Sequence, residues 1–451
     1  MRDKSQPATI TIILTFASIT MIRNILETTG TRILNALINL VILILLTREI
    51  GSEGFGIITI ILIDITIIQL LVDLIAGSAL IYFSSRTDII KLLIPSYLWI
   101  FIIISTTWGI FAAMTNYFPV LYSLIVPIKF ETDIILLALL NATMLTHYNL
   151  LLGKKRIGVY NIIFTVQILT LLITLVYRIF ILNDPSVESW IISLYFAFGV
   201  SVILSFIVII QKLKAYNLKG SYSIIKQVFR FGLVTQLANI LHIGNKRISF
   251  YFVRWFTGLP AVGVYGAGTQ LTEGLRLIGQ SISLVQFSEI SNTNNKDYAV
   301  KITIKLMKFS VLLTIFAVIV LLIIPTDIYL LIFTAEFTDL KYVIIALSPG
   351  VIALSSNTIF SHYFAGLGRP VISLWANGIG FLITITLAIL LIPTFGYIGA
   401  AATVSTSYIT SVIYQYFVFK KETGIKLSQW LPEKNDLNDF KRIIKGLIKK
   451  E

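Results

Sequence analysis

The sequence has no cysteine and few charged residues. Its 451 residues include 0 Cys and 3 His, and Asp, Glu, Lys and Arg together make up 13% of the chain. Without cysteine the chain can form neither disulfide bonds nor thiolate metal sites. A soluble domain carries roughly 25% charged residues, so this composition excludes a protein that lies mostly in water.

Long apolar runs take the place of the missing charge. Hydrophobic residues make up 56% of the chain, and its mean hydropathy is +0.88. Runs of about 20 apolar residues are long enough to cross a bilayer as helices. We therefore expect an all-α membrane protein. The twelve spans that the sequence predicts are 25–47, 54–83, 91–115, 131–152, 157–182, 187–211, 228–257, 262–290, 300–324, 338–366, 370–393 and 396–420.

The spans divide into two groups of six with more polar segments around them. We expect an N-lobe over 25–211 and a C-lobe over 228–420, joined by a polar linker at 212–227. Residues 1–24 predict a helix that lies at the membrane interface, with a signal peptide as the alternative. Residues 421–451 predict a basic, amphipathic helix on the cytosolic surface.

Lysine and arginine are distributed unequally between the two sides of the predicted spans. They gather at the chain ends and in the connections after even-numbered spans, such as those of Arg86, Lys154 and Arg369. The opposite side has few of them. They are Arg48, Lys129, Arg178, Arg254 and Lys341. Because cytosolic connections carry the excess of Lys and Arg, we expect both termini in the cytosol and a plasma or inner membrane location. This distribution also accounts for the net charge of +14 without a nucleic acid partner.

The chain repeats itself over an interval of about 210 residues. REIGSEGFG at 48–56 corresponds to FTGLPAVGVYG at 256–266, and LLGKKRIGVYN at 151–161 corresponds to GLGRPVISLWAN at 366–377. Each half also has a short apolar segment before its fourth span, VLYSLIVPI and DIYLLIF. Six spans in each half make equivalent spans enter from the same side. This pattern predicts two pseudo-symmetric six-helix lobes around a central cavity.

These motifs carry a family resemblance. The turn R-x-x-G-x-x-G-F-G, the segment VGVYGAGTQLTE, and GLGRP followed by PTFGYIGAAAT resemble the polysaccharide flippases of the O-antigen and teichuronic-acid type. Those proteins belong to the multidrug/oligosaccharidyl-lipid/polysaccharide (MOP) exporter superfamily. The resemblance runs from about residue 25 to 420. It implies a fold similar to multidrug (MATE) transporters and the flipping of polyprenyl-diphosphate-linked oligosaccharide for cell-surface polysaccharide biosynthesis.

The resemblance also implies partners. They are the lipid-linked oligosaccharide, membrane lipids and other polysaccharide-assembly proteins, and a monomer is expected. The resemblance implies no cofactor. It does allow transport that is coupled to H⁺ or Na⁺. The segment before the first span and the tail depart from the family's core and carry no implied role.

A polar stripe follows one face of the seventh predicted span. Its members recur at steps of three, four and three, which is the spacing of one helical face. They are Asn239, His242, Lys246 and Ser249. Lys246 is predicted near mid-bilayer. Arg247 is its neighbour, and adjacent residues do not share a helical face, so one of these two cations should point away from the stripe.

The first span has a matching polar stripe. At an interval of 207 residues, Arg32, Asn35 and Asn39 correspond to Asn239, His242 and Lys246. Two equivalent helices therefore turn polar faces toward one interior, where a diphosphate could meet Lys and Arg donors. The substrate-binding residues that we predict are Arg32, Asn35, Asn39, His242, Lys246, Arg247 and Arg276.

Acidic residues lie at equivalent positions in the second and eighth spans. Asp64 corresponds to Glu273 at an interval of 209 residues, and both are predicted near mid-bilayer. They are the predicted ion-coupling residues, for a proton or Na⁺. Two structural alternatives stay open. Arg276 could pair with Glu273 and brace its helix, and Lys246 and Arg247 could pair with Asp64 or Asp73 across the lobes.

Three other intramembrane residues have structural explanations. His147 and His362 are lone histidines, which we expect to be hydrogen-bonded core groups, not metal ligands. Asp73 either interrupts its helix or takes part in transport. No nucleophile–base set, phosphate loop or metal-spaced His cluster stands out, and the outer connections are too short for a polymerase or ligase site. We therefore expect no enzyme activity and no metal.

Two rival functions remain. A multidrug or cation antiporter of the same superfamily would need an acidic cavity. The predicted cavity instead has more cations than anions, so an anionic substrate is favoured. A scaffold without transport activity in a glycan-assembly complex is the other possibility, and the sequence does not exclude it.

Overall fold

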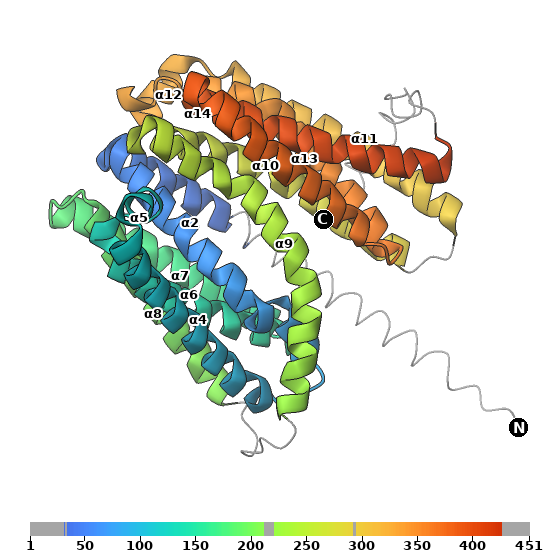
Figure 1. Cartoon of the computed structure of the whole chain (residues 1–451), viewed down its shortest axis with the longest axis horizontal. Helices are drawn as coiled ribbons and strands as arrows, with labels where there is room; N and C mark the ends of the chain where they lie inside the picture. Colours follow the sequence, from blue (N-terminus) through green and yellow to red (C-terminus); the bar gives the residue numbers. More distant parts are fainter. Residues whose placement is uncertain (1–30, 32–33, 212–220, 292–294, 426–451) are drawn as a thin grey trace, which may run out of the picture. The chain divides into compact units, whose positions relative to one another are not determined.

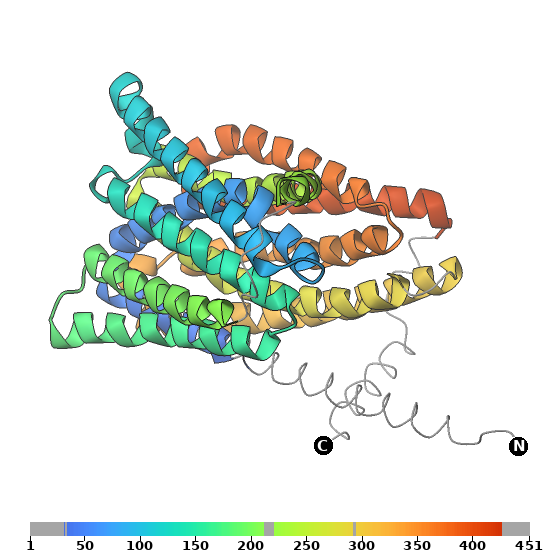
Figure 2. The same cartoon turned by 90° about the horizontal axis from the view of Figure 1, so that it is seen from below.

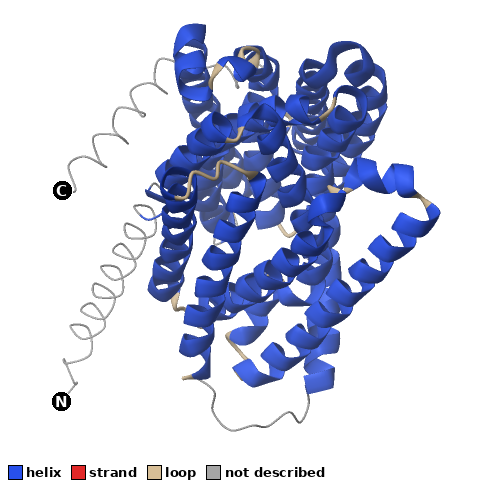
Figure 3. Cartoon of the chain, turned by 90° about the vertical axis from the view of Figure 1, so that its left-hand side faces the viewer, coloured by secondary structure: helices blue, strands red, loops and turns tan. Residues whose placement is uncertain are grey.

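The computed structural model describes residue 31 and residues 34–211, 221–291 and 295–425. All regular structure in these residues is helical, with no strand among them (Figure 3). The predicted interfacial helix at 1–24 and nearly all of the predicted basic tail lie outside the described residues, as does most of the linker.

The described chain divides into two compact units (Figure 1). Unit 1 consists of the described residues up to Glu49 together with Ile61–Gln236, and unit 2 consists of Ile50–Ile60 and the described residues from Leu237 onward. Two helices, α2 (Gly51–Ala76) and α9 (Ser221–Thr257), therefore belong partly to each unit. The lobe boundaries predicted from sequence stay a prediction.

Unit 1 begins with a helix at residues 34–49. Its centre is α6 (Glu131–Gly153), which packs against α3 (Ser78–Ser84), α4 (Ile89–Tyr117) and α8 (Val187–Ile210). The helix α8 also packs against α7 (Ile157–Val176) (Figure 2). The short helix α5 is the predicted VLYSLIVPI segment. The elements after α2 are α3 (Ser78–Ser84), α4 (Ile89–Tyr117), α5 (Pro119–Ile125), a 3₁₀ turn (Ile128–Phe130), α6 (Glu131–Gly153), α7 (Ile157–Val176), a π turn (Tyr177–Ile181) and α8 (Val187–Ile210).

Unit 2 is organised around α13, which packs against α10, α11 and α14. Aromatic side chains such as Phe360, Phe364 and Phe419 fill one part of its core. The short helix α12 is the predicted DIYLLIF segment. The elements after α9 are α10 (Leu259–Ser291), α11 (Lys296–Ile323), α12 (Thr326–Phe333), a 3₁₀ turn (Ala335–Phe337), α13 (Leu340–Gly366) and α14 (Val371–Thr423).

Eight helical segments in the described residues are long and apolar enough to cross a membrane. The seventh and eighth predicted spans, α9 and α10, are not among them, because their polar residues lower the hydropathy. The first predicted span lies partly outside the described residues. One of the eight, α14, contains both the eleventh and twelfth predicted spans, which separate at Gly396, where φ is 55°. The all-α membrane fold is confirmed.

The second predicted span, 54–83, is interrupted at Gly77, between α2 and α3. A Cβ atom at Gly77 would lie 2.5 Å from the Asp73 carbonyl oxygen. That same carbonyl accepts hydrogen bonds from Gly77 N (3.2 Å) and Gln236 Nε2 (3.3 Å), and the Asp73 carboxylate accepts one from Gln69 Nε2 (2.7 Å). Asp73 thus lies at the interruption of its helix, as one of its two interpretations predicted.

The two lone histidines in the spans are hydrogen-bonded, as expected. His147 is fully buried between the Tyr97 hydroxyl (2.5 Å) and the Ser205 hydroxyl (2.7 Å). His362 Nδ1 lies 2.9 Å from the Thr358 carbonyl oxygen. Both rings therefore have partners within their own unit.

Candidate functional site

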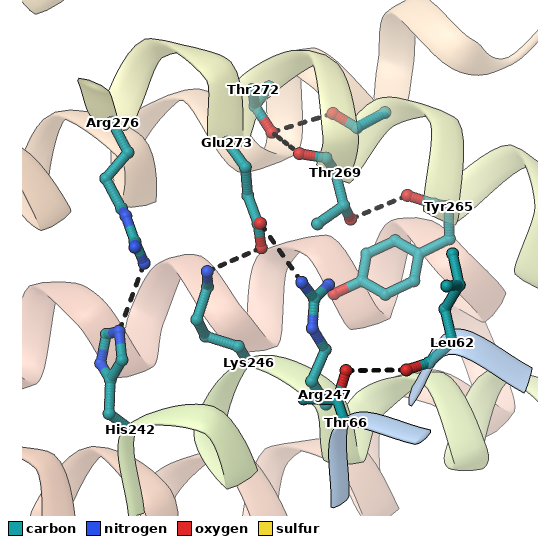
Figure 4. A network of polar contacts seen from close by, with 11 residues as sticks. Leu62, Thr66, His242, Lys246, Arg247, Tyr265, Thr269, Thr272, Glu273 and Arg276 are labelled. Carbon is teal, nitrogen blue, oxygen red and sulfur yellow. Dashed lines mark hydrogen bonds and ion pairs between the residues drawn. The ribbon is translucent and has the colours of Figure 1, made fainter. Parts of the chain in front are cut away.

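The helices α9 and α10 bring four charged residues of unit 2 close together, namely Lys246, Arg247, Glu273 and Arg276. Gly258, with φ at 90°, separates them and allows the chain to reverse within one residue. Lys246 on α9 and Glu273 on α10 lie at comparable sequence distances from this glycine. The reversal therefore places them at the same level of two antiparallel helices (Figure 4).

A single carboxylate holds two cations at this level. Lys246 Nζ lies 2.9 Å from Glu273 Oε1, and Arg247 Nη2 lies 3.3 Å from Glu273 Oε2. The Lys246 side chain is only 5% exposed, whereas Arg247 and Glu273 are each 26% exposed. A cation at the centre of a membrane helix costs about 2.5–3.5 kcal/mol on insertion scales. The shared carboxylate offsets that cost.

A third cation lies one turn along α10. Arg276 Nη1 lies 3.4 Å from His242 Nε2 (Figure 4). On its other side, with the Gln280 amide oriented so that its oxygen faces the guanidinium, this oxygen accepts from Arg276 Nε (3.2 Å) and Nη2 (2.8 Å). Both partners are uncharged when His242 is neutral. Arg276 therefore keeps its positive charge available.

The cluster formed by His242, Lys246, Arg247, Glu273 and Arg276 has an excess of positive charge. It contains three cations and one carboxylate, with two of the cations paired to that carboxylate. Half-buried cations that lack a full complement of carboxylates favour an anion as the missing partner. We call these five residues the α9–α10 cluster.

The geometry of this cluster differs from one sequence-based expectation and from one of the alternatives that the sequence left open. Lys246 and Arg247 both reach Glu273, although one of them was expected to point away, because long flexible side chains can curve around the helix toward one acceptor. Within unit 2, Glu273 is the ion-pair partner of both cations. Arg276 contacts His242 and Gln280 and forms no ion pair with Glu273 in the described structure.

The stripe predicted on the first span is only partly visible. Arg32 lies outside the described residues. Asn35 is 3% exposed, and neither atom of its amide group has a hydrogen-bond partner among the described residues. Asn39, one turn later, is exposed. A buried amide without a partner costs roughly 1–3 kcal/mol, so Asn35 calls for a ligand or a partner outside the described residues.

Asp64 lies in the middle of α2, in unit 1. Its side chain is 5% exposed, and the neighbouring Ile60, Ile61 and Ile68 are buried as well. The nearest residues along its helix are thus apolar. The structure places Asp64 and Glu273 in comparable positions near the middle of their own helices.

Sequence reasoning missed a second buried polar cluster in unit 2. Asn245 is 1% exposed, and its side-chain oxygen accepts hydrogen bonds from Thr384 Oγ1 and from Ser407 Oγ (2.8 Å). Both hydroxyl oxygens also lie within hydrogen-bond distance of the Gly380 carbonyl oxygen, at 3.0 Å and 2.8 Å. An asparagine within an apolar span is costly unless it is hydrogen-bonded, and this was the available signal. Among the described residues, no group of three His, Asp or Glu side chains could hold a metal ion.

Comparison with known proteins shows which family the chain belongs to. The family described as "Polysaccharide biosynthesis protein" matches residues 21–287. The "Probable low-salt glycan biosynthesis flippase Agl15" of Haloferax volcanii is 26% identical over 183 residues, which cover 38% of this chain and 39% of that protein. The matches to curated relatives span about two fifths of the length of those proteins.

Solved structures show the same fold. The lipid II flippase MurJ, in an inward closed conformation, has a TM-score of 0.68 at 18% identity, covering 88% of this chain and 87% of that one. An inward-facing multidrug resistance MATE family transporter of the MOP superfamily has a TM-score of 0.70 at 15% identity, covering 86% and 94%. The chain is thus a multi-pass membrane protein with the fold of MurJ and of the MATE transporters, and it belongs to the polysaccharide biosynthesis protein family.

Proposed function

We propose that this protein flips a polyprenyl-diphosphate-linked oligosaccharide across the cell membrane by alternating access. The diphosphate would bind at the α9–α10 cluster, the sugar would contact polar side chains of the lobes, and the polyprenyl tail would remain in lipid. A lipid-linked glycan flippase agrees with the family of the chain and with the name of its Haloferax volcanii relative, a probable glycan biosynthesis flippase.

The observation that carries this proposal is the charge of the α9–α10 cluster. Glu273 can neutralise only one of three cations, so a bound anion would complete the charge balance. Arg247 and Arg276 are planar donors that match phosphate oxygens, and Lys246 adds a point charge. Charge-assisted hydrogen bonds of this kind are about twice as strong as neutral ones.

The same charge disfavours the rival antiporter of cationic drugs. At the α9–α10 cluster a cationic cargo would meet three like charges and one carboxylate. Like-charge juxtaposition in a half-buried site costs several kcal/mol. The MATE-like fold by itself does not distinguish the two functions, because one fold serves unrelated cargoes.

Coupling to an ion forms a second part of the proposal. Asp64 is a buried carboxyl group in an apolar stretch of α2, and it would take up and release a proton or Na⁺ there. Binding in one orientation of the lobes and release in the other would couple flipping to a gradient. Both termini would lie in the cytosol, as the distribution of Lys and Arg predicts.

A proteoliposome assay tests the cargo charge. Purified protein would be reconstituted with a fluorescent polyprenyl-diphosphate disaccharide and, separately, with a cationic dye. We expect flipping of the diphosphate lipid, loss of most of that flipping in Lys246→Ala/Arg247→Ala, and no uptake of the dye. Lys129→Ala is the matched control, since Lys129 pairs with Glu188 on the exposed surface of unit 1. Dye uptake without lipid flipping would overturn the proposal.

A further inference from the structure

Unit 1 contains a pocket that none of the residues of the α9–α10 cluster lines. It has a volume of about 610 Å³. One wall comes from the end of α3 and the turn before α4. The other wall comes from the first turns of α9, which form the lower end of that helix in Figure 1. The lining residues are Tyr82, Phe83, Arg86, Thr87, Ile224, Gln227 and Arg230. Arg230 lies more than four turns of α9 before Lys246, so the two sites are separate.

The first arginine of this pocket is held in place by uncharged groups. The Arg86 guanidinium carbon lies 3.9 Å from the centre of the Tyr82 ring. Arg86 Nη1 donates to the Tyr82 carbonyl oxygen (3.1 Å) and to Ser85 Oγ (3.3 Å). No carboxylate of the described residues forms an ion pair with Arg86. These contacts orient the guanidinium and leave its charge uncompensated.

The second arginine faces the same space from α9. Arg230 is exposed, and it forms no ion pair within the described part of the chain. Gln227, almost one turn earlier, adds a side-chain amide, and Thr87 on the opposite wall adds a hydroxyl. Two guanidinium groups and two neutral polar groups thus converge on one pocket.

The surroundings of the pocket are basic as well. Lys154 Nζ donates to the carbonyl oxygen of Thr87 (3.0 Å). The nearest carboxylate along the chain, Asp88, lies 3.9 Å from Lys91 and is not among the lining residues. The charge around the pocket therefore remains positive, which attracts an anion to it.

The other lining residues suit a ligand with an apolar part. Tyr82, Phe83 and Ile224 provide rings and an aliphatic side chain beside the two arginines. Nearby, Trp99 of α4 packs edge-on against Phe229 of α9, with ring centres 6.1 Å apart. Trp is common at the level of lipid headgroups. The connection with Arg86 is one of those with a Lys and Arg excess, which predicts the cytosolic side.

We infer that this pocket binds the phosphate group of a lipid in the cytosolic leaflet, with Arg86 and Arg230 as its two donors. Guanidinium forks match phosphate oxygens in geometry and charge. The lipid could be an ordinary anionic phospholipid or the diphosphate-linked cargo before it moves to the α9–α10 cluster. The second source rests on the proposed function, whereas the first is independent of it.

Lipid binding to the full chain tests this inference. The protein would be placed in phosphatidylcholine nanodiscs and titrated with two fluorescent probes, a phosphatidic acid and a prenyl diphosphate, with protein-free nanodiscs as blank. We expect Arg86→Gln/Arg230→Gln to weaken binding of at least one probe by about tenfold or more, as the loss of charge-assisted hydrogen bonds implies. Arg86→Lys/Arg230→Lys should recover part of this binding, because a point charge remains.

Two matched variants make the result specific. Arg369→Gln removes an exposed arginine that pairs with Glu422 in unit 2 and should leave binding of phosphatidic acid unchanged. Lys129→Ala, which removes an exposed cation that pairs with Glu188 in unit 1, should leave it unchanged as well. A selective loss of diphosphate binding would identify the cargo as the ligand, and a selective loss of phosphatidic acid binding would identify a phospholipid site.

The inference and the proposed function can fail separately. The double variant Arg86→Gln/Arg230→Gln must first elute and melt like the wild type. If it then binds both probes as the wild type does, the inferred lipid site is wrong. If the α9–α10 variants flip normally while the pocket variants lose phosphatidic acid binding, the proposed function fails and the pocket stands.

Discussion

Lys246 and Glu273 form an ion pair that joins α9 to α10, with Nζ 2.9 Å from Oε1. Each partner is tolerated in an apolar helix because of the other. Arg247 shares the same carboxylate. Because one carboxylate serves two cations, the cluster has an excess of positive charge. Structural and transport roles of these residues are therefore coupled, and the variants below are chosen to separate them.

Glu273→Gln should destabilise the protein more than it changes cargo selectivity. It leaves Lys246, which is 5% exposed, without a carboxylate, and loss of one partner of a buried pair costs about 3–5 kcal/mol. Thermal unfolding in detergent should show a clear fall in Tm. Lys246→Met/Glu273→Gln, which removes both charges, should recover much of that fall.

The double variant separates stability from function. It should fold and yet flip the diphosphate lipid poorly, since one cation of the cluster is missing. The exposed pair Lys129–Glu188 is the control, because neutralising a surface pair changes stability by less than about 1 kcal/mol. A Glu273→Gln protein with the wild-type Tm would show that the carboxylate is not needed to support Lys246.

Conservative replacement of the cations should give a graded loss of transport. Lys246→Arg keeps the charge and should flip more lipid than Lys246→Ala. Arg32→Ala, predicted to lie on the matching stripe of the first span, should also reduce flipping. The measurement is the initial flipping rate at equal protein density in the vesicles. Equal rates in Lys246→Ala, Arg32→Ala and the wild type would remove these residues from the binding site.

Two glycines allow the start of α10 to contact α2 within unit 2. A Cβ atom at Gly263 would lie 2.0 Å from the Ser52 carbonyl oxygen, and one at Gly56 would lie 2.1 Å from the Leu259 carbonyl oxygen. Backbone atoms cannot move aside as a flexible side chain would. Gly263→Ala should therefore separate the two helices and lower the Tm.

The matched control for this contact is on the same helix. A Cβ atom at Gly274 would meet nothing within 4 Å. Gly274→Ala should be neutral or stabilising by up to about 1 kcal/mol, because alanine favours helix more than glycine does. If the two alanine variants melt alike, the close contact between α2 and α10 contributes nothing to stability.

Much of this fold could be predicted because the bilayer dictates it. Apolar runs long enough to span must be helical there, so the positions of α4, α6, α7 and α8 follow closely from the sequence. Helix ends and interruptions were harder. Beside the break at Gly77, the Asp73 carbonyl oxygen accepts a hydrogen bond from Gln236, which is far away in the sequence.

The candidate site was predicted in its residues but not in its pairing. Lys246, Arg247, Glu273 and Arg276 were recognisable because charges are rare in apolar spans. Which carboxylate each cation meets depends on the reach of long side chains, and a helical projection does not contain this information. The pocket around Arg86 and Arg230 was missed because its two walls come from segments about 140 residues apart with no shared motif.

Asp64 and Glu273 differ in their surroundings, and this difference predicts different roles. Glu273 contacts two cations and is therefore held as a carboxylate. Asp64 is 5% exposed and has buried isoleucines at neighbouring positions of α2. In the proposed mechanism the buried Asp64 carboxyl group takes up and releases the coupling ion, whereas Glu273 stays between its two cations. We therefore expect Asp64 to carry the coupling and Glu273 to support structure.

Asp64→Asn should remove the response of flipping to a gradient. The asparagine keeps the shape of the side chain but can neither bind a proton nor neutralise Na⁺. Proteoliposomes with the fluorescent lipid-linked sugar would be given an inward proton gradient, a Na⁺ gradient or neither. The wild type should flip faster with one of the gradients, and Asp64→Asn should flip at the gradient-free rate in all three conditions. Glu273→Gln should keep its relative response at whatever rate its stability allows. A full gradient response in Asp64→Asn would assign the coupling to another residue.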